Sequence, residues 1–158
     1  MDKLAFLETI KAARYDFESV LRRLDDEQMS QPGASGEMSV KDIIAHVTWY
    51  EREMVGLLQG RALAGSDLWG LSPAERNAAI LAANRDRALA EVRDEARQVY
   101  LQLIELLERT DEDVLNNPAH FRDMPADWVP WQVITENSSE HYTGHAADIR
   151  AWLETQEC

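Results

Sequence analysis

The sequence predicts an all-α protein folded as a four-helix bundle, and three observations support this. Apolar residues recur three and four positions apart over four long segments, which is the spacing of amphipathic helices. No segment alternates apolar and polar residues as a strand does, and no internal repeat is visible. The length of 158 residues suits one domain. We therefore expect a single helical-bundle domain spanning residues 1–158.

The first two helices follow from periodicity and from their boundary residues. The first is expected from Asp2 to about Leu24, before the loop sequence SQPGASG at residues 30–36, whose proline and glycines end a helix. Ser39 then precedes an apolar-periodic segment with Asp42 three positions later, which predicts a capping box. The second helix should run from Ser39 to about Gln59 and end at Gly60.

The second half of the chain predicts two further long helices. Ser72 and Pro73 followed by Glu75 are typical of a helix N-terminus, and the helical pattern continues to Arg109. Such a length favours a break, which we expect in the polar run at residues 84–87. A long connection from Asn116 to Pro130 is the kind of segment that covers a site. The last helix is expected from about Trp131 to Leu153.

Composition narrows the range of partners. Sixteen basic and 29 acidic residues give a net charge of −13, which disfavours binding to phosphate backbones and anionic membranes. No apolar run reaches the length of a membrane span, and the N-terminal segment lacks the pattern of a secretory signal. We therefore expect a cytoplasmic protein with a small-molecule partner, no nucleic acid and no membrane. The only cysteine is Cys158, so a metal would need histidine and carboxylate ligands.

Two histidines in the last predicted helix are the main candidates for a functional site. His141 and His145 are four residues apart, so they lie one helical turn above each other and can direct ring nitrogens at one point. On a continuous helix through Ile134, both fall on the inward apolar face. Imidazoles buried there need partners, and a metal would satisfy both. The alternative is that they hydrogen-bond to Asn137, Glu140, Tyr142 or the backbone and serve only packing.

His46 is the candidate third ligand, on the flank of the second helix's apolar face. Three protein ligands with an open position are the arrangement of a catalytic metal site. Imidazole suits several divalent metals, and zinc and nickel are expected first, with iron as a further candidate. His120, in the long connection, is interpreted as a surface or lid residue.

Aromatic and polar residues near the histidines are further candidates for a binding pocket. Tryptophan at helical spacing is most often a core residue, so each assignment competes with that interpretation. Glu53 and Asn137 are also candidates for hydrogen-bonding or proton-transfer roles beside the histidines, although a solvated position is the alternative for Glu53. The pocket candidates are Trp49, Tyr50, Glu53, Trp128, Trp131 and Asn137.

Two segments resemble the signature blocks of a known family. The sequences MSVKDIIAHVTWYERE at 38–53 and ITENSSEHYTGHAADIRAWL at 134–153 resemble those of the DinB/YfiT-like superfamily, and most closely its ClbS/DfsB branch. The order and length match over nearly the whole chain. The resemblance implies a four-helix bundle, often a homodimer, with metal ligands at His46, His141 and His145.

The resemblance also implies alternatives for function. Superfamily members include metal-dependent hydrolases and transferases or isomerases that use a low-molecular-weight thiol as cosubstrate. ClbS-like members open the electrophilic ring of a cyclopropane-bearing genotoxin without relying on a metal. We expect a metal-dependent enzyme acting on a small electrophilic molecule. The alternatives are a metal-independent detoxification or sequestering protein and a non-catalytic helical bundle.

Overall fold

The computed structural model describes residues 1–157, and over this range the chain is helical with no β-strand. Cys158 lies outside the described residues. No helix in the described range is long and apolar enough to cross a membrane. The elements in chain order are α1 (Lys3–Leu21), α2 (Asp26–Ser30), α3 (Val40–Gly60), the 3₁₀-helix η1 (Asp67–Gly70), α4 (Pro73–Asn84), α5 (Leu89–Arg109), α6 (Glu112–Asn116), the 3₁₀-helix η2 (Pro118–His120), α7 (Pro130–Glu136) and α8 (Ser139–Gln156).

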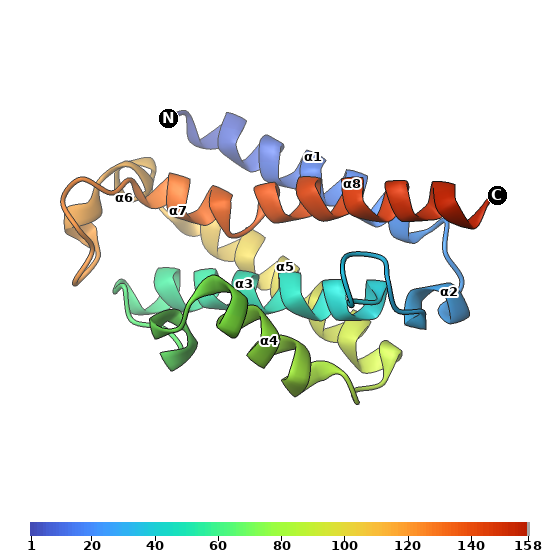
Figure 1. Ribbon diagram of the computed structural model, residues 1–158. Helices are drawn as coiled ribbons and strands as arrows, with labels where there is room; N and C mark the ends of the chain where they lie inside the picture. The colour runs from blue at the N-terminus through green and yellow to red at the C-terminus, as the bar shows by residue number, and fades with distance from the viewer. Residues whose placement is uncertain (158) are drawn as a thin grey trace.

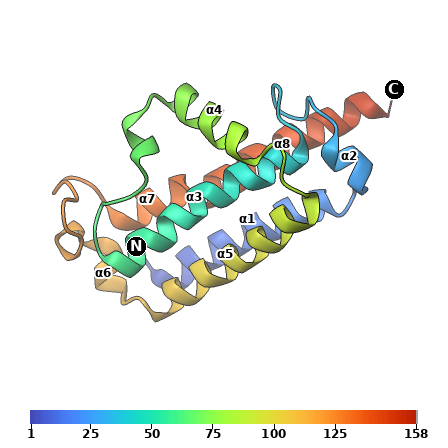
Figure 2. The same ribbon diagram turned by 90° about the horizontal axis from the view of Figure 1, so that it is seen from below.

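Four long helical segments form the bundle: α1, α3, α5, and α7 continued by α8 (Figure 1). Helix α3 packs mainly against α5, and α1 packs mainly against α8. The shorter α4 lies along the outside of α3 (Figure 2). The structure thus confirms the predicted all-α bundle.

The residues predicted to cap the N-termini of two helices form the expected hydrogen bonds. The Ser39 side chain accepts from the Asp42 backbone N–H, and the Asp42 side chain accepts from the Ser39 backbone N–H, so the capping box of α3 is complete. Ser72 and Glu75 form the same arrangement at α4. The helical region after Pro73 is interrupted between Asn84 and Leu89, where the break was expected.

The final helix differs from the prediction because it is divided in two. Helix α7 ends at Glu136, and α8 begins at Ser139. Polar side chains at the junction bond to preceding carbonyls: Ser138 Oγ donates to Ile134, and Asn137 Nδ2 donates to Val133. Such bonds offer the backbone an alternative to the helical ladder.

This break changes which residues of α8 face inward. Its buried face is centred on Tyr142, Ala146 and Ile149, all completely buried, whereas His141 and His145 are only partly buried. The expectation that both histidines lie in the middle of the inward face was wrong, because a helical wheel cannot be carried across the break. The pair lies at the edge of that face, where ring nitrogens can reach a neighbouring site.

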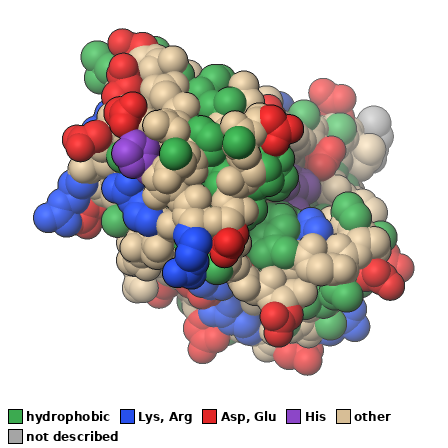
Figure 3. Space-filling model, turned by 90° about the vertical axis from the view of Figure 1, so that its left-hand side faces the viewer, with side chains coloured by type: hydrophobic (Ala, Val, Ile, Leu, Met, Phe, Trp, Pro, Cys, Tyr) green, Lys and Arg blue, Asp and Glu red, His purple; other side chains and the backbone are tan. Residues whose placement is uncertain are grey.

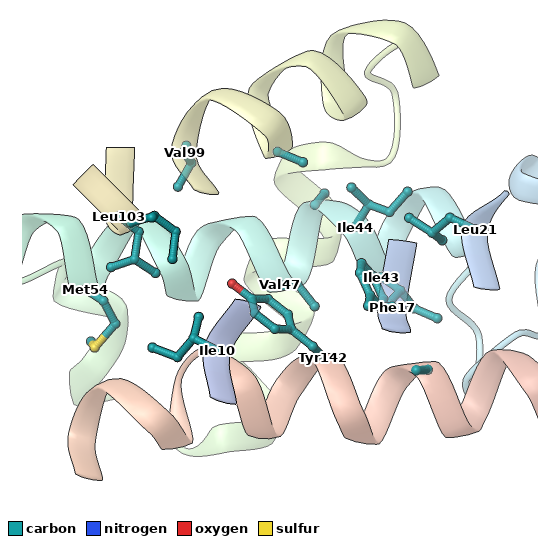
Figure 4. Packing of buried hydrophobic residues seen from close by; sticks show 14 of the residues in the cluster. Ile10, Phe17, Leu21, Ile43, Ile44, Val47, Met54, Val99, Leu103 and Tyr142 are labelled. Carbon is teal, nitrogen blue, oxygen red and sulfur yellow. The ribbon is translucent and has the colours of Figure 1, made fainter. Parts of the chain in front are cut away.

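The core is mainly apolar, although Arg14, His46 and Glu51 are also buried. Figure 4 shows Tyr142 extending from α8 among Ile10, Val47 and Phe17, which come from α1 and α3. Leu4, an apolar residue near the start of α1, lies outside the core and is 67% exposed.

A buried polar network joins α1, α3, α5 and α8 at the level of Tyr142. Arg14 of α1 donates through Nη1 to Glu51 Oε1 of α3 at 2.8 Å, and the Tyr142 hydroxyl donates to the same oxygen. Arg14 also donates to the Ala96 carbonyl, and its guanidinium lies 4.6 Å from the ring centre of Tyr100. Burial raises the pKa of Glu51, and Arg14 opposes that shift. The second Glu51 oxygen, Oε2, is buried without a hydrogen-bond partner.

Replacing Arg14 should therefore destabilise the fold strongly. Arg14→Met removes the charge that compensates Glu51, and we expect the free energy of unfolding to fall by about 3–5 kcal/mol. Adding Glu51→Gln should restore more than half of this loss, because no buried charge then remains. Urea unfolding at 25 °C measures both changes.

The matched control for this experiment is the exposed pair Arg109 and Glu105, whose side chains are 76% and 67% exposed. Arg109→Met should change the free energy of unfolding by less than about 1 kcal/mol. A loss below about 1 kcal/mol for Arg14→Met itself would show that the buried network does not stabilise the bundle.

Candidate functional site

The facing helices α3 and α8 bring the three predicted histidines together. The ring centres of His46 and His141 are 5.3 Å apart, those of His46 and His145 are 5.1 Å apart, and those of His141 and His145 are 5.9 Å apart. Tyr50, one turn after His46, completes the cluster, with its ring centre 4.5 Å from that of His141. His120 is not part of it, because its Nε2 pairs with Asp113 at 2.6 Å on the surface.

Burial keeps the three imidazoles unprotonated. Desolvation, together with His145 and His141, lowers the pKa of His46 from 6.5 to about 3. Desolvation and the neighbouring His145 lower the pKa of His141 to about 4, against the effect of the Asn137 backbone. Burial also lowers the pKa of His145, although Asp148 opposes that shift. Neutral imidazoles are the form that binds metal ions.

Asp148 orients one of these rings. His145 Nδ1 lies 3.2 Å from Asp148 Oδ2, and the same oxygen accepts from Ser35 Oγ at 3.1 Å. With the proton on Nδ1, Nε2 of His145 carries the lone pair, as in histidine ligands backed by a carboxylate. Asp148 was not among the predicted site residues, although its position three residues after His145 placed it on the same helical face.

The histidine cluster meets some requirements of a metal site. A metal about 2 Å from each ligating nitrogen lies about 3 Å from each ring centre, so tetrahedral ligands have ring centres about 5 Å apart. The observed separations of 5.1–5.9 Å match this spacing. In addition, Nδ1 of His46 is buried and has no hydrogen-bond partner within residues 1–157.

The ring nitrogens do not yet form a coordination group. Within residues 1–157, no group of three or more histidine, cysteine, aspartate or glutamate side chains is arranged to hold a metal ion. The ring positions therefore fit a shared ion, and the ring orientations do not. Rotation of the imidazoles about their side-chain bonds is the change that coordination would need.

A cavity of about 740 Å³ lies next to the histidine cluster, at one end of the bundle. Its walls come from the C-terminal half of α3, the connection at residues 62–66, Trp69 of η1 and residues 127–137. Figure 3 looks onto this end of the molecule, where hydrophobic side chains appear across part of the surface and charged side chains of both signs lie around them.

Contacts between aromatic rings link the cavity to the histidines. The ring of Trp69, which lines the cavity, has its centre 5.6 Å from that of Tyr50, which in turn packs against His141. Asn137 also lines the cavity and lies one turn before His141. The three histidines are not among the described residues that line the cavity.

The pocket candidates occupy three different environments. Glu53, Trp128 and Asn137 line the cavity. Trp49 and Tyr50 lie behind it, with ring centres 5.3 Å and 5.6 Å from that of Trp69. Trp131 packs elsewhere, its ring centre 6.2 Å from that of Phe6.

Glu53 holds the wall of the cavity in place. Its Oε1 accepts from Trp69 Nε1 and from the backbone N–H of Ser66, both at 2.6 Å. Gly65 lies so close that a Cβ added there would be 2.7 Å from Glu53 Oε1 and 2.9 Å from Trp69 Nε1. A side chain at this position would therefore push the Glu53 carboxylate and the Trp69 ring aside. Sequence periodicity contains no signal for this contact.

Gly65→Ala should displace the Glu53 carboxylate and weaken both of its hydrogen bonds. We expect a loss of about 1 kcal/mol in unfolding free energy and faster hydrogen exchange at the Ser66 amide, measured by NMR. Gly70→Ala is the control, because nothing lies within 4 Å of a Cβ at that position. Equal exchange rates in the two variants would contradict the proposed contact.

Comparison with known proteins identifies the class and then the family. Helical bundles of this arrangement also occur in several solved proteins. The model of the DinB superfamily matches residues 9–154, so the chain belongs to the DinB superfamily. This confirms the predicted superfamily. None of the curated protein sequences matches this chain.

Three solved structures illustrate the similarity. DfsB, described as a sibling lethal factor precursor, is 21% identical, with a TM-score of 0.83 over 99% of this chain and 97% of its own. The colibactin self-resistance protein ClbS, in complex with double-stranded DNA, is 12% identical, with a TM-score of 0.77 over 94% and 93%. A mycothiol-dependent maleylpyruvate isomerase is 16% identical, with a TM-score of 0.70 over 94% of this chain and 61% of its own. These TM-scores establish a shared fold.

Proposed function

We propose that this chain is a metal-dependent enzyme acting on a small electrophilic molecule bound in the cavity beside the histidines. The observation that carries the proposal is the convergence of His46, His141 and His145, three neutral imidazoles with ring centres 5.1–5.9 Å apart. Superfamily membership and the mycothiol-dependent isomerase fold support it. The reaction is hydrolysis or transfer of a low-molecular-weight thiol.

In this proposal the chain's own residues hold and shape the site. His46, His141 and His145 provide the ligands, and Asp148 fixes the orientation of His145. A divalent metal, with zinc or nickel expected first, would supply Lewis acidity toward a substrate, water or thiol. Tyr50 covers one side of His141 and limits access of water from that direction.

The wall of the cavity positions the substrate. Glu53 keeps Trp69 in place through the bond to its indole nitrogen. Asn137, which lines the cavity one turn before His141, places an amide between the bound molecule and the histidines. The substrate therefore approaches the cluster along an apolar surface with a polar group at its inner end.

Metal content provides the direct test of this proposal. Protein purified without an affinity tag and supplied with Zn²⁺ should bind one equivalent, measured by elemental analysis and calorimetry. His46→Ala, His141→Ala and His145→Ala should each weaken binding at least tenfold, because each removes one of three ligands. His120→Ala is the matched control and should bind as the unaltered protein does. Binding below one equivalent, or binding unaffected by His46→Ala, would contradict the proposal.

A second candidate is a ClbS-like protein in which the histidines act as acid, base or hydrogen-bonding groups on an electrophile without a metal. The specific observation in its favour is that Nδ1 of His46, on a neutral imidazole, is buried without a hydrogen-bond partner within residues 1–157 and is available for proton transfer. Ring opening of a cyclopropane that persists in excess chelator would establish this candidate and contradict the first.

We also infer that the chain does not bind duplex DNA, although the ClbS structure contains it. The net charge of −13 opposes binding to phosphates. At 150 mM salt, fluorescence anisotropy with a labelled duplex should show no binding tighter than about 10⁻⁴ M. Saturable micromolar binding that weakens with salt would contradict this inference.

A further inference from the structure

The cavity beside the histidines carries charge of only one sign. Its lining includes the carboxylates of Glu53, Asp127 and Glu136, and no lysine, arginine or histidine among residues 1–157 is part of the wall. Asp127 and Glu136 are exposed and lie at the rim, whereas Glu53 is half-buried. Field lines from like charges in an apolar cleft concentrate there, so the cavity attracts cations and repels anions.

The inner carboxylate has an oxygen available to a ligand. Both hydrogen bonds that Glu53 accepts, from Ser66 and from Trp69, go to Oε1. Within the described part of the chain Oε2 makes no hydrogen bond and is not sealed in the core. The bonds to Oε1 hold the carboxylate still, so a cation meeting Oε2 does not have to order this side chain.

The apolar lining suits an organic cation rather than a metal ion. Met54, Leu57 and Val133 form hydrophobic surface, and Trp69 and Trp128 add aromatic rings. Trp128 is 43% exposed, one of few large hydrophobic side chains in the described range that remain so open. Its open ring face provides hydrophobic contact area for the hydrocarbon part of a ligand. One face of Trp69 already carries a cation, since the Arg76 guanidinium lies 4.6 Å from its ring.

We propose that the cavity selects small organic amines in their protonated form, with the ammonium group at Glu53 and the apolar part against Trp128. This inference gives the substrate class of the proposed site. That the bound amine reacts rests on the proposed function, whereas binding of the amine requires no metal. The substrate would carry its electrophilic centre at the opposite end from the amine, toward Asn137 and the histidines. Anionic substrates and carboxylate-bearing thiols are disfavoured by the same charges.

The test compares three probes of similar shape and different charge: 2-phenylethylamine, 2-phenylethanol and phenylacetate. Binding to the full chain is followed by NMR through the indole N–H resonances of Trp69 and Trp128, in excess chelator. We expect the amine to bind at least tenfold more tightly than phenylacetate, with the alcohol between them. Equal binding of the three probes, or no shift of either indole resonance, would overturn the proposal.

Variants identify the groups responsible. Glu53→Gln removes the charge while its amide oxygen can still accept from Trp69, and it should reduce the preference for the amine over phenylacetate to less than threefold. The double variant Asp127→Asn with Glu136→Gln should reduce this preference in part. The control, Glu8→Gln with Asp86→Asn, changes the net charge equally at exposed positions outside the cavity and should leave the preference unchanged.

The results separate this inference from the proposed function. An unchanged preference in Glu53→Gln, or an equal loss in the control, would overturn the assignment of the amine to Glu53. Because the probes are bound without metal and without turnover, amine selectivity stands even if zinc binding fails. A protein that binds zinc and shows no amine preference would retain the proposed function and lose the inferred substrate class.

Discussion

The hydrogen bond from Tyr142 to Glu51 is the interaction on which the site depends most. It joins α8 to α3 inside the core, and Arg14 adds α1 through the same carboxylate oxygen. Tyr142 is adjacent to His141, so the bond sets the height of α8 against α3 and brings the histidines of α8 level with His46. A slip of one turn, about 5.4 Å, would separate these rings. Apolar contacts alone tolerate such a slip more readily than a buried, directional bond does.

Much of the fold could be predicted because its signals are local. Ser39 with Asp42 and Ser72 with Glu75 mark helix starts within four residues, and the polar run at 84–87 marks a break. The division between α7 and α8 was missed because the bonds of Asn137 and Ser138 to preceding carbonyls also occur inside continuous helices. The short α2 has a complete capping box at Asp25 and Gln28, but five residues are too few to show periodicity.

The candidate site could be predicted only in part. The four-residue spacing of His141 and His145 is visible in the sequence, whereas His46 depended on the family resemblance. Arg14 and Glu51 are separated by 37 positions and read as ordinary polar residues of amphipathic helices. No periodic pattern shows that two charges meet in the core. The cavity was equally hidden, because much of its wall comes from connections, whose packing depends on contacts such as that of Gly65 with Glu53.

Helices hold the histidine cluster, whereas connections form much of the cavity wall, and this difference affects how such a protein changes during evolution. The histidines are on α3 and α8, while much of the cavity wall belongs to the connections at residues 62–66 and 127–129. Connections accept substitutions and insertions at little thermodynamic cost. Binding preferences can therefore diverge between relatives while the bundle and its histidine cluster stay constant. New substrate specificities can then arise without a change of fold.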